Sequence, residues 1–331
     1  MRAVVCETLG TPDTLVVRTD WPEPEPGPGQ VKVRLLARAV QYVDVLMVAG
    51  QYQTKPPVPF IPGGEAAGEV VALGEGVTGF SVGDMVMSRH SPSGAFAEFG
   101  VSPADQTMLI PQGLGVEAAA GFRSAYSTAY HALVQRGRLQ PGETLLVHGA
   151  AGGIGLAAVQ VGKALGATVI GAASTEEKRA LVLENGADYV IGYDPVVDGR
   201  GTFRDKVKEL TGGRGADVVY DPVGDWVFEE SMRCLNWGAR ILILGFLGGG
   251  PAMARTNHLL IKGASAVGVR LGGFVEAEPE TAAENLRVLC DWASKGRVKP
   301  HVSHVLPLEK AAEALQLLVD RKVVGKAVLS G

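Results

Sequence analysis

A glycine-rich turn between an apolar strand and a helical segment constrains this chain more than any other feature. The run Leu145–His148 leads into the turn, which reads Gly-Ala-Ala-Gly-Gly-Ile-Gly at 149–155, and a helical pattern continues to Leu165. From Ala150 the spacing is A-x-G-x-x-G, so alanine replaces the first glycine of the usual fingerprint. Gly152 lets the backbone approach a pyrophosphate, Gly155 lets helix pack on strand, and the helix N-terminus supplies N–H groups and positive dipole. A dinucleotide site is the functional interpretation, and a turn that serves packing alone is the alternative.

The pattern of strands changes near residue 121. Before it the chain is β-rich, with valine-rich runs between Gly and Pro residues at Val31–Val40, Ala67–Leu73, Asp84–Met87 and Ala95–Val101. After it strands alternate with helices, and the uncharged β-branched strands favour a parallel sheet covered on both faces. These strands are expected at Thr144–His148, Thr168–Ala172, Tyr189–Ile191, Val218–Tyr220, Ile241–Leu244 and Ala266–Val269. Helical patterns at Glu280–Ser294 and Leu308–Asp320 then precede a last strand, Lys326–Leu329.

The simplest organisation is an α/β chain in which a doubly wound domain interrupts a β-rich one. We expect the β-rich domain at 1–120, the dinucleotide-binding domain at 121–270, and a tail at 271–331 that returns to the first domain. The formal net charge of −4 over 331 residues leaves no basic excess for nucleic acid. No apolar stretch is long enough to span a membrane and no leader is apparent. Three widely spaced cysteines fit a reducing, cytoplasmic setting.

The strand after the turn indicates which dinucleotide binds. Sites that prefer NAD usually end this strand with Asp or Glu to hold the ribose hydroxyls. Here the strand ends Gly-Ala-Ala-Ser at 171–174, and Lys178 and Arg179 follow. A small polar residue with cations nearby suits a 2′-phosphate, so NADPH is expected. The alternative is that the two cations form a solvated helix face and that Glu176 or Glu177 holds the ribose. Ser174 is expected to begin the helix in a capping box with Glu177.

The motifs together resemble the zeta-crystallin-like quinone oxidoreductases of the medium-chain dehydrogenase superfamily. The resemblance runs nearly end to end. It is carried by Asp44 with Gly50–Tyr52, Pro62–Gly68, Val82–Asp84, Gly94–Glu98, Ser127–Tyr130, His148–Gly155, Tyr220–Gly224 and Val324–Val328. It implies a Rossmann domain, meaning a doubly wound parallel sheet, inserted in a GroES-like catalytic domain. It also implies a homodimer, in which Ala266–Val269 would be the edge strand.

The resemblance also implies that no metal is bound. Zinc-dependent relatives carry Cys, His and Cys where this chain has Gln41, Gly64 and Ser124. Catalytic zinc needs three thiolate, imidazole or carboxylate ligands, which these positions do not offer. His301 and His304 have a spacing that a metal could use, but a polar loop before Val305 is the plainer interpretation.

Cofactor residues carry over from the resemblance position by position. Lys178, Tyr193 and Arg321, with Ser174 beside them, match positions around the adenosine 2′-phosphate. For Tyr193 the alternative is a half-buried tyrosine at a strand end. Phe246 matches a position near the nicotinamide. The remaining cofactor positions are Thr128, Tyr130, Gly152, Gly153, Ile154, Gly155, Val269 and Arg270.

Three functions remain open at this point. The first is hydride transfer from NADPH to a quinone, a planar conjugated acceptor whose oxygens can take protons from water. The second is NADPH-dependent reduction of the C=C bond of an enal, enone or acrylate, which needs a donor in the pocket and, for an acrylate, a cation such as Arg123. The third is a non-catalytic protein that binds NADPH. The expected catalytic residues are Gln41, Tyr42 and Tyr52; for Tyr52 the alternative is packing on Pro56 and Pro57.

Overall fold

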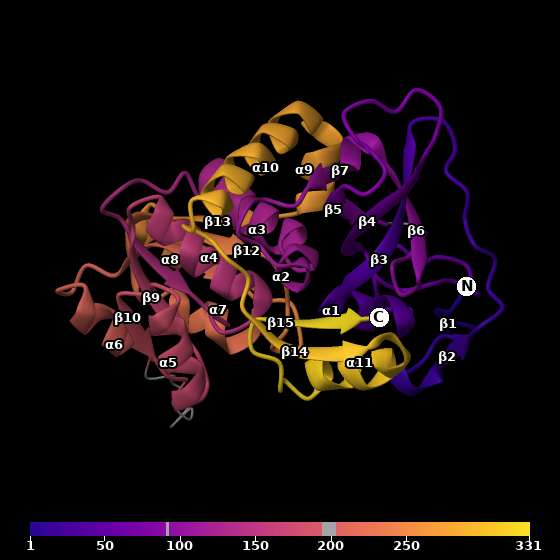
Figure 1. Cartoon of the computed structure of the whole chain (residues 1–331). Helices are drawn as coiled ribbons and strands as arrows, with labels where there is room; N and C mark the ends of the chain where they lie inside the picture. The colour runs from indigo at the N-terminus through magenta and orange to yellow at the C-terminus, as the bar shows by residue number, and fades with distance from the viewer. Residues whose placement is uncertain (91–92, 194–202) are drawn as a thin grey trace. The chain divides into compact units, whose positions relative to one another are not determined.

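The computed structural model describes residues 1–90, 93–193 and 203–331, and the chain divides into two compact units (Figure 1). Unit 1 comprises Met1–Ser124 and Lys299–Gly331, and unit 2 comprises Ala125–Val298. The chain therefore returns to the first unit at 299, later than the expected 271. Two helices cause the difference, α9 (Leu271–Ala277) and α10 (Pro279–Ser294), because both pack inside unit 2.

Unit 1 is built on a twisted, mostly antiparallel sheet. Its strand order is β14-β15-β3-β4-β5-β7, with β6 also paired to β3, and β1 and β2 form a separate antiparallel pair. The strands are β1 (Ala3–Cys6), β2 (Leu15–Arg18), β3 (Gln30–Val40), β4 (Glu65–Leu73), β5 (Met85–Arg89), β6 (Phe99–Pro103), β7 (Thr107–Leu109), β14 (Val302–Pro307) and β15 (Lys326–Ser330). The helices of this unit are α1 (Tyr42–Val48), α2 (Val116–Ala120) and α11 (Ala311–Val319).

The C-terminal strand completes this sheet. β15 runs antiparallel to β3, with Ala327 opposite Val40 and Leu329 opposite Arg38. The fully buried Arg38 donates to the carbonyl oxygens of Ala97 and Gly331, at 2.8 and 2.7 Å, and so ties the chain end to the core. The final strand predicted from the sequence is confirmed. The expected polar loop around His301 and His304 is instead the lead into β14, with His304 inside the strand.

Unit 2 holds a parallel sheet whose six strands, within the described residues, lie in the order β10-β9-β8-β11-β12-β13. Numbered along the chain this order is 3-2-1-4-5-6, the order of a dinucleotide-binding domain. The strands are β8 (Thr144–Val147), β9 (Thr168–Ala172), β10 (Tyr189–Ile191), β11 (Ala216–Asp221), β12 (Leu235–Ile243) and β13 (Ser265–Gly268). The central strand β8 is buried along its whole length, as an apolar parallel strand covered on both faces should be.

The helices of unit 2 alternate with these strands. They are α4 (Gly153–Ala164), α5 (Glu176–Glu184), α6 (Phe203–Leu210), α7 (Asp225–Ser231) and α8 (Thr256–Lys262), while α3 (Arg123–Tyr130) begins at the boundary of the units. α10 turns Leu286 and Leu289 inward, and in α9 the ring of Phe274 stacks on His131 at 4.0 Å between ring centroids. Among the described residues, no helix is both long and apolar enough to cross a bilayer.

Candidate cofactor and substrate sites

The glycine-rich turn joins the carboxyl end of β8 to the first turn of α4. Gly149 has a positive φ of 57°, and its carbonyl oxygen accepts the N–H of Gly152 at 2.9 Å. A Cβ placed on Gly155 would come within 2.2 Å of that same oxygen, so only glycine fits there. Gly152 caps α4, and Gly152, Gly153 and Ile154 stay partly exposed. The turn has the close helix–strand packing and open N-terminus that a pyrophosphate site requires.

The loop after β11 lies against this turn. A Cβ on Gly149 would touch the ring of Pro222 at 3.5 Å. Asp221 ends β11, and its Oδ1 accepts the N–H groups of Val223 and Gly224 at 2.8 and 2.9 Å. Burial raises the pKa of Asp221 above its usual value. β8 and β11 are the neighbours at which the strand order reverses, and ligands of such sheets bind at the carboxyl ends of the strands there.

The nicotinamide-side candidates follow the next two strands at the same edge. Phe246 follows β12 and is 48% exposed, and its ring lies 3.0 Å from where a Cβ on Gly224 would be. Val269 continues β13 by donating its N–H to the Ile243 carbonyl at 2.9 Å, and the exposed Arg270 caps α9. The structure thus brings these candidates to the edge that carries the glycine-rich turn.

Two further cofactor candidates lie on α3. Thr128 and Tyr130 are partly exposed. The Tyr130 ring packs edge-on against Trp292 of α10, at 5.6 Å between centroids, and burial raises its pKa. The role of both residues therefore stays a prediction.

The end of β9 carries the residues expected at the adenosine. β9 ends at Ala172 without an acid, and the exposed Ser174 follows. The helix cap differs from the expectation: Thr175, not Ser174, caps α5, because the Thr175 hydroxyl accepts the N–H of Lys178 at 3.3 Å. Arg179 points back to donate to the Ala173 carbonyl at 3.2 Å. The role of Lys178 at a 2′-phosphate stays a prediction.

The other two phosphate candidates are placed differently. Arg321 belongs to unit 1, where it follows α11 with a φ of 58°. Tyr193 belongs to unit 2, but its hydroxyl lies 2.9 Å from the N–H of Gly149 and 3.0 Å from Nδ1 of His148. The hydroxyl of Tyr193 therefore has partners inside the unit, unlike the phosphate contact expected from the sequence. Sequence spacing could not show this, because both partner residues follow a different strand, β8.

In unit 1, a partly buried polar network joins Gln41 to Ser124, two of the positions that the family resemblance matches to zinc ligands. The Gln41 Nε2 donates to Oε1 of Glu65 at 2.7 Å, and Oε2 of Glu65 accepts the Ser124 N–H at 2.8 Å. The Ser124 hydroxyl donates to Oε1 of Gln41 at 3.5 Å. The ammonium of Lys326 lies 3.7 Å from Oε1 of Glu65, and both side chains are less than 10% exposed. Burial raises the pKa of Glu65.

These residues do not fit a zinc ion. A carboxamide, a hydroxyl and a glycine replace the thiolate and imidazole donors, and a buried ammonium already balances the carboxylate of Glu65. Throughout the described residues, no three His, Cys, Asp or Glu side chains gather as a metal site. The network instead holds the Gln41 carboxamide in one orientation.

The ends of α1 separate the three expected catalytic residues. Gln41 caps the helix, and its N–H donates to the buried Asp44 at 2.8 Å; burial raises the pKa of Asp44 to about 7. Tyr42 is the first helical residue and is 40% exposed. Tyr52 lies past the other end, where its N–H donates to the Leu46 carbonyl at 3.1 Å. The structure thus places Gln41 and Tyr42 together and Tyr52 apart from them.

The sequence analysis missed Glu65, Lys326 and His148 as parts of a site. All three lie in motifs that carry the family resemblance, which was the available signal. The contacts of these residues depend on how β4, β15 and β8 pair with other strands, so they could not be derived from sequence spacing.

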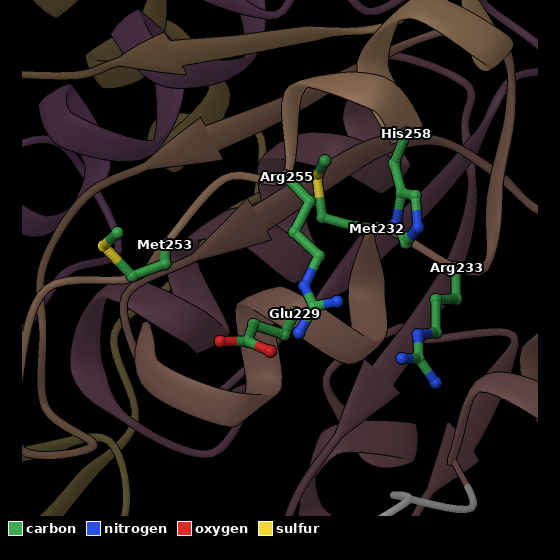
Figure 2. A pocket seen from close by; sticks show the side chains of 6 residues that line it. All are labelled: Glu229, Met232, Arg233, Met253, Arg255 and His258. Carbon is green, nitrogen blue, oxygen red and sulfur yellow. The ribbon is translucent and has the colours of Figure 1, made fainter.

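A pocket on unit 2 lies near α7 and α8 (Figure 2). It is lined by Glu229, Met232, Arg233, Met253, Arg255 and His258. Its volume is about 10 Å³, which suits one water molecule and neither a dinucleotide nor a quinone.

Two family models match this chain. Residues 27–134 match the model described as alcohol dehydrogenase GroES-like domain, and residues 153–287 match the one described as zinc-binding dehydrogenase. The quinone oxidoreductase-like protein 2 homolog of Nematostella vectensis is 39% identical over 331 residues, which cover 99% of this chain and 88% of the relative.

Solved structures match over the full length. A mycobacterial protein solved in complex with NADPH is 34% identical, with a TM-score of 0.90 and coverage of 100% of both chains. The quinone oxidoreductase of Escherichia coli, also solved with NADPH, is 29% identical, with a TM-score of 0.89 and 100% coverage of both chains.

Proposed function

Because this chain belongs to the quinone oxidoreductase family of zinc-free medium-chain reductases, we propose that it transfers a hydride from NADPH to a quinone. The observation that carries the proposal is the Gln41–Glu65–Ser124–Lys326 network, which stands where zinc-dependent relatives bind their metal. The glycine-rich turn, in contrast, keeps the geometry of a dinucleotide site. A metal-free reductase needs an acceptor that does not depend on a Lewis acid. A quinone is such an acceptor, since its reduced oxygens can be protonated by water.

Each part of the chain has a defined task in this proposal. NADPH, when bound, supplies the hydride. The amides at the start of α4 and the open face of Gly152 hold its pyrophosphate, and Ser174 and Lys178 bind the 2′-phosphate. Gln41 gives one amide hydrogen to Glu65 and keeps the second for the oxygen of the acceptor. Phe246 supplies apolar surface near the nicotinamide.

Reduction of an activated C=C bond is the second candidate, and the fixed Gln41 amide favours it, since such a donor could polarise an enone carbonyl. A panel of quinones, enals and acrylates assayed with NADPH tests the two reactions directly. We expect quinones to give the highest kcat/KM. An enone or acrylate that surpasses every quinone would reverse the assignment, and no turnover of any acceptor would indicate a non-catalytic NADPH-binding protein.

Tyr52 provides a further test of the reaction. With a quinone as the natural acceptor, Tyr52→Phe should lower kcat similarly for quinones and enones, by less than about threefold, because neither proton has to come from the enzyme. If C=C reduction were the natural reaction, the enolate left by hydride addition would take its α-carbon proton from a donor of the enzyme, and loss of that donor would cost ~10²-fold or more. Tyr189→Phe, on the partly exposed β10 of unit 2, is the matched control. A loss confined to enones would favour the second candidate.

Cofactor selectivity should depend on Lys178, the proposed phosphate cation of unit 2. Replacing Lys178 with alanine should raise the KM for NADPH by on the order of tenfold or more, because a charged hydrogen bond contributes about 1.5–3 kcal/mol. The KM for NADH should change by less than about twofold, since NADH has no 2′-phosphate. Lys206→Ala, on the exposed face of α6, is the control. Equal losses for both cofactors would contradict the assignment of the phosphate site.

We also propose a homodimer formed through the edge of the unit 2 sheet. β13 is the last strand of this sheet and is largely exposed. Trp237 of the neighbouring strand β12, and Leu260 and Ile261 of α8, which precedes β13 in the chain, are 73%, 81% and 66% exposed. An uncharged edge strand with an apolar patch beside it favours pairing with a second copy.

Light scattering at micromolar concentration should therefore give the mass of a dimer. The double variant Leu260→Asp/Ile261→Asp should be monomeric but still folded, because both positions are exposed in the single chain and the new charges would be buried only in the dimer. Leu183→Asp, which places a charge on a half-exposed site of α5, should remain dimeric. A monomeric wild-type chain would rule the dimer out.

The proposal includes a cytoplasmic enzyme without nucleic acid partners. All three cysteines are free thiols, two of them buried, which suits a reducing compartment. The negative net charge of −4 offers no field that attracts phosphate backbones.

A further inference from the structure

A chain of hydrogen bonds crosses the interior of unit 2 and ends on the first amide of the glycine-rich turn. His148, which directly precedes the turn, is fully buried. Its Nε2 lies 2.7 Å from Oγ of Ser231, and its Nδ1 lies 3.0 Å from the hydroxyl of Tyr193. The Tyr193 oxygen accepts the N–H of Gly149 at 2.9 Å. The chain joins the end of β8 to the residues after β10 and at the end of α7.

The direction of these bonds follows from one hydroxyl. Ser231 has a single hydrogen, which it donates to the Val227 carbonyl at 2.7 Å. Nε2 of His148 must then carry the ring hydrogen and donate to Ser231. Burial lowers the pKa of His148 to about 3, so the ring is neutral and Nδ1 has a free lone pair. Tyr193 therefore donates to Nδ1, and its oxygen remains available to the turn.

The ring of Tyr193 is held in place by its neighbours. It packs edge-on against Phe203 and Trp226, with centroids 6.1 and 6.2 Å away, and tilts against His148 at 5.8 Å. Burial raises the pKa of Tyr193 well above its usual value, so the hydroxyl keeps its hydrogen. The Ala172 carbonyl, 3.5 Å away, is a longer acceptor for that hydrogen and is also internal. Both the donor and the acceptor function of this hydroxyl thus serve the interior.

We infer that Tyr193 is a positioning residue for the glycine-rich turn, and that it supports NADPH and NADH equally instead of selecting the 2′-phosphate. Its bond fixes the N–H of Gly149, whose carbonyl receives Gly152 and contacts Gly155. A shift of Gly149 would therefore move the whole surface that holds a pyrophosphate, a group that both dinucleotides share. The inference rests on the proposed function, because it takes the turn to be the dinucleotide site.

The structure offers a closely matched control. Tyr220 lies on β11 of the same unit and is fully buried, but its hydroxyl has no hydrogen-bond partner among the described residues. Tyr193→Phe and Tyr220→Phe each remove one buried oxygen, and only the first breaks a bond to the turn. Tyr193→Phe should raise the Kd of NADPH and of NADH by the same factor, on the order of tenfold, as expected for one lost hydrogen bond with its donor left buried. Tyr220→Phe should leave both Kd values unchanged.

The test is direct binding of NADPH and NADH by fluorescence, together with amide hydrogen exchange of the cofactor-free chain. In Tyr193→Phe, exchange should accelerate at residues 149–155 and not in α10; in Tyr220→Phe the turn should stay protected. A loss for NADPH alone would show a phosphate contact and overturn the inference, as would unchanged exchange at the turn. If the wild-type chain bound neither dinucleotide, the proposed function would fail, while the exchange result would still decide whether Tyr193 positions the turn.

Discussion

Replacing Gly155 with alanine is expected to destabilise the apo protein and to remove NADPH binding together. The added methyl would lie 2.2 Å from the Gly149 carbonyl oxygen and 2.8 Å from the Cα of Ala150. Both are backbone atoms, so relief requires that α4 and the turn move apart. Overpacking of this kind costs about 1–3 kcal/mol, and more where backbone must shift. Urea unfolding and fluorescence titration with NADPH would measure the two losses.

Gly152→Ala should separate these effects. A methyl at that position meets only the Gly149 oxygen, at the ordinary contact distance of 3.4 Å, so the free energy of unfolding should change by less than about 0.5 kcal/mol. NADPH affinity should nevertheless fall sharply, because the methyl covers the surface that a pyrophosphate must approach. Gly272→Ala in α9, where nothing lies within 4 Å of the new methyl, is the neutral control. Normal NADPH affinity in Gly152→Ala would mean that the pyrophosphate binds elsewhere.

Features encoded by local pattern were predictable from the sequence. The apolar run before the glycines, the glycine spacing and the helix after them specify β8, the turn and α4 within one or two residues. β9 at Thr168–Ala172 and β10 at Tyr189–Ile191 have the predicted bounds. The expected doubly wound parallel sheet and the GroES-like unit are confirmed, because uncharged β-branched runs and short turn-bounded strands are strong local signals.

Features that depend on which core a segment joins were not predictable. α10 has an apolar face that could cover either unit, and only the packing of Leu286 and Leu289 assigns it to unit 2. The adjacent hydroxyls of Ser174 and Thr175 compete for one helix cap, and the sequence does not decide between them. The predicted strand Ala95–Val101 begins only at Phe99, because the preceding segment bridges to β1 instead.

The candidate site also combines features that the sequence predicts with features that only the fold shows. Gln41, Gly64 and Ser124 could each be compared with the zinc ligand expected at that position, but the polar network that replaces the metal could not be predicted from these three residues. Glu65 and Lys326 lie far apart in the sequence and meet only because β15 pairs with β3 and β3 with β4. A charge pair formed through two strand pairings leaves no periodicity in the sequence, so only the fold reveals it.

Removing the positive charge of that pair is the second large effect that we expect. Lys326→Met keeps most of the length of the side chain but leaves Glu65 buried without its countercharge, 3.7 Å from where the ammonium was. Breaking a buried ion pair from one side costs about 3–5 kcal/mol. An exposed pair behaves differently: Lys310→Met, which breaks the pair with Glu313 on the surface, should cost less than about 1 kcal/mol.

The pH dependence distinguishes a lost charge from a lost contact. Burial already raises the pKa of Glu65, and the loss of Lys326 raises that pKa further, because Lys326 is the strongest of the groups that lower it. The folded variant then binds a proton that the unfolded chain has released, so its free energy of unfolding falls as the pH rises. Urea unfolding should show a deficit against wild type that is larger at about pH 8 than at about pH 5.

The double variant Glu65→Gln/Lys326→Met completes the argument, because it removes both charges and leaves similar volumes. Without a buried charge to desolvate, it should regain most of the stability that Lys326→Met loses and should show no deficit that grows with pH. Its kcat should nevertheless be lower than that of the wild type, since the neutral carboxamide that replaces the Glu65 carboxylate has one acceptor oxygen and cannot receive both the Gln41 amide and the Ser124 N–H in the same geometry. A Lys326→Met variant as stable as Lys310→Met, or with a deficit that does not change with pH, would show that the ammonium is not what balances Glu65.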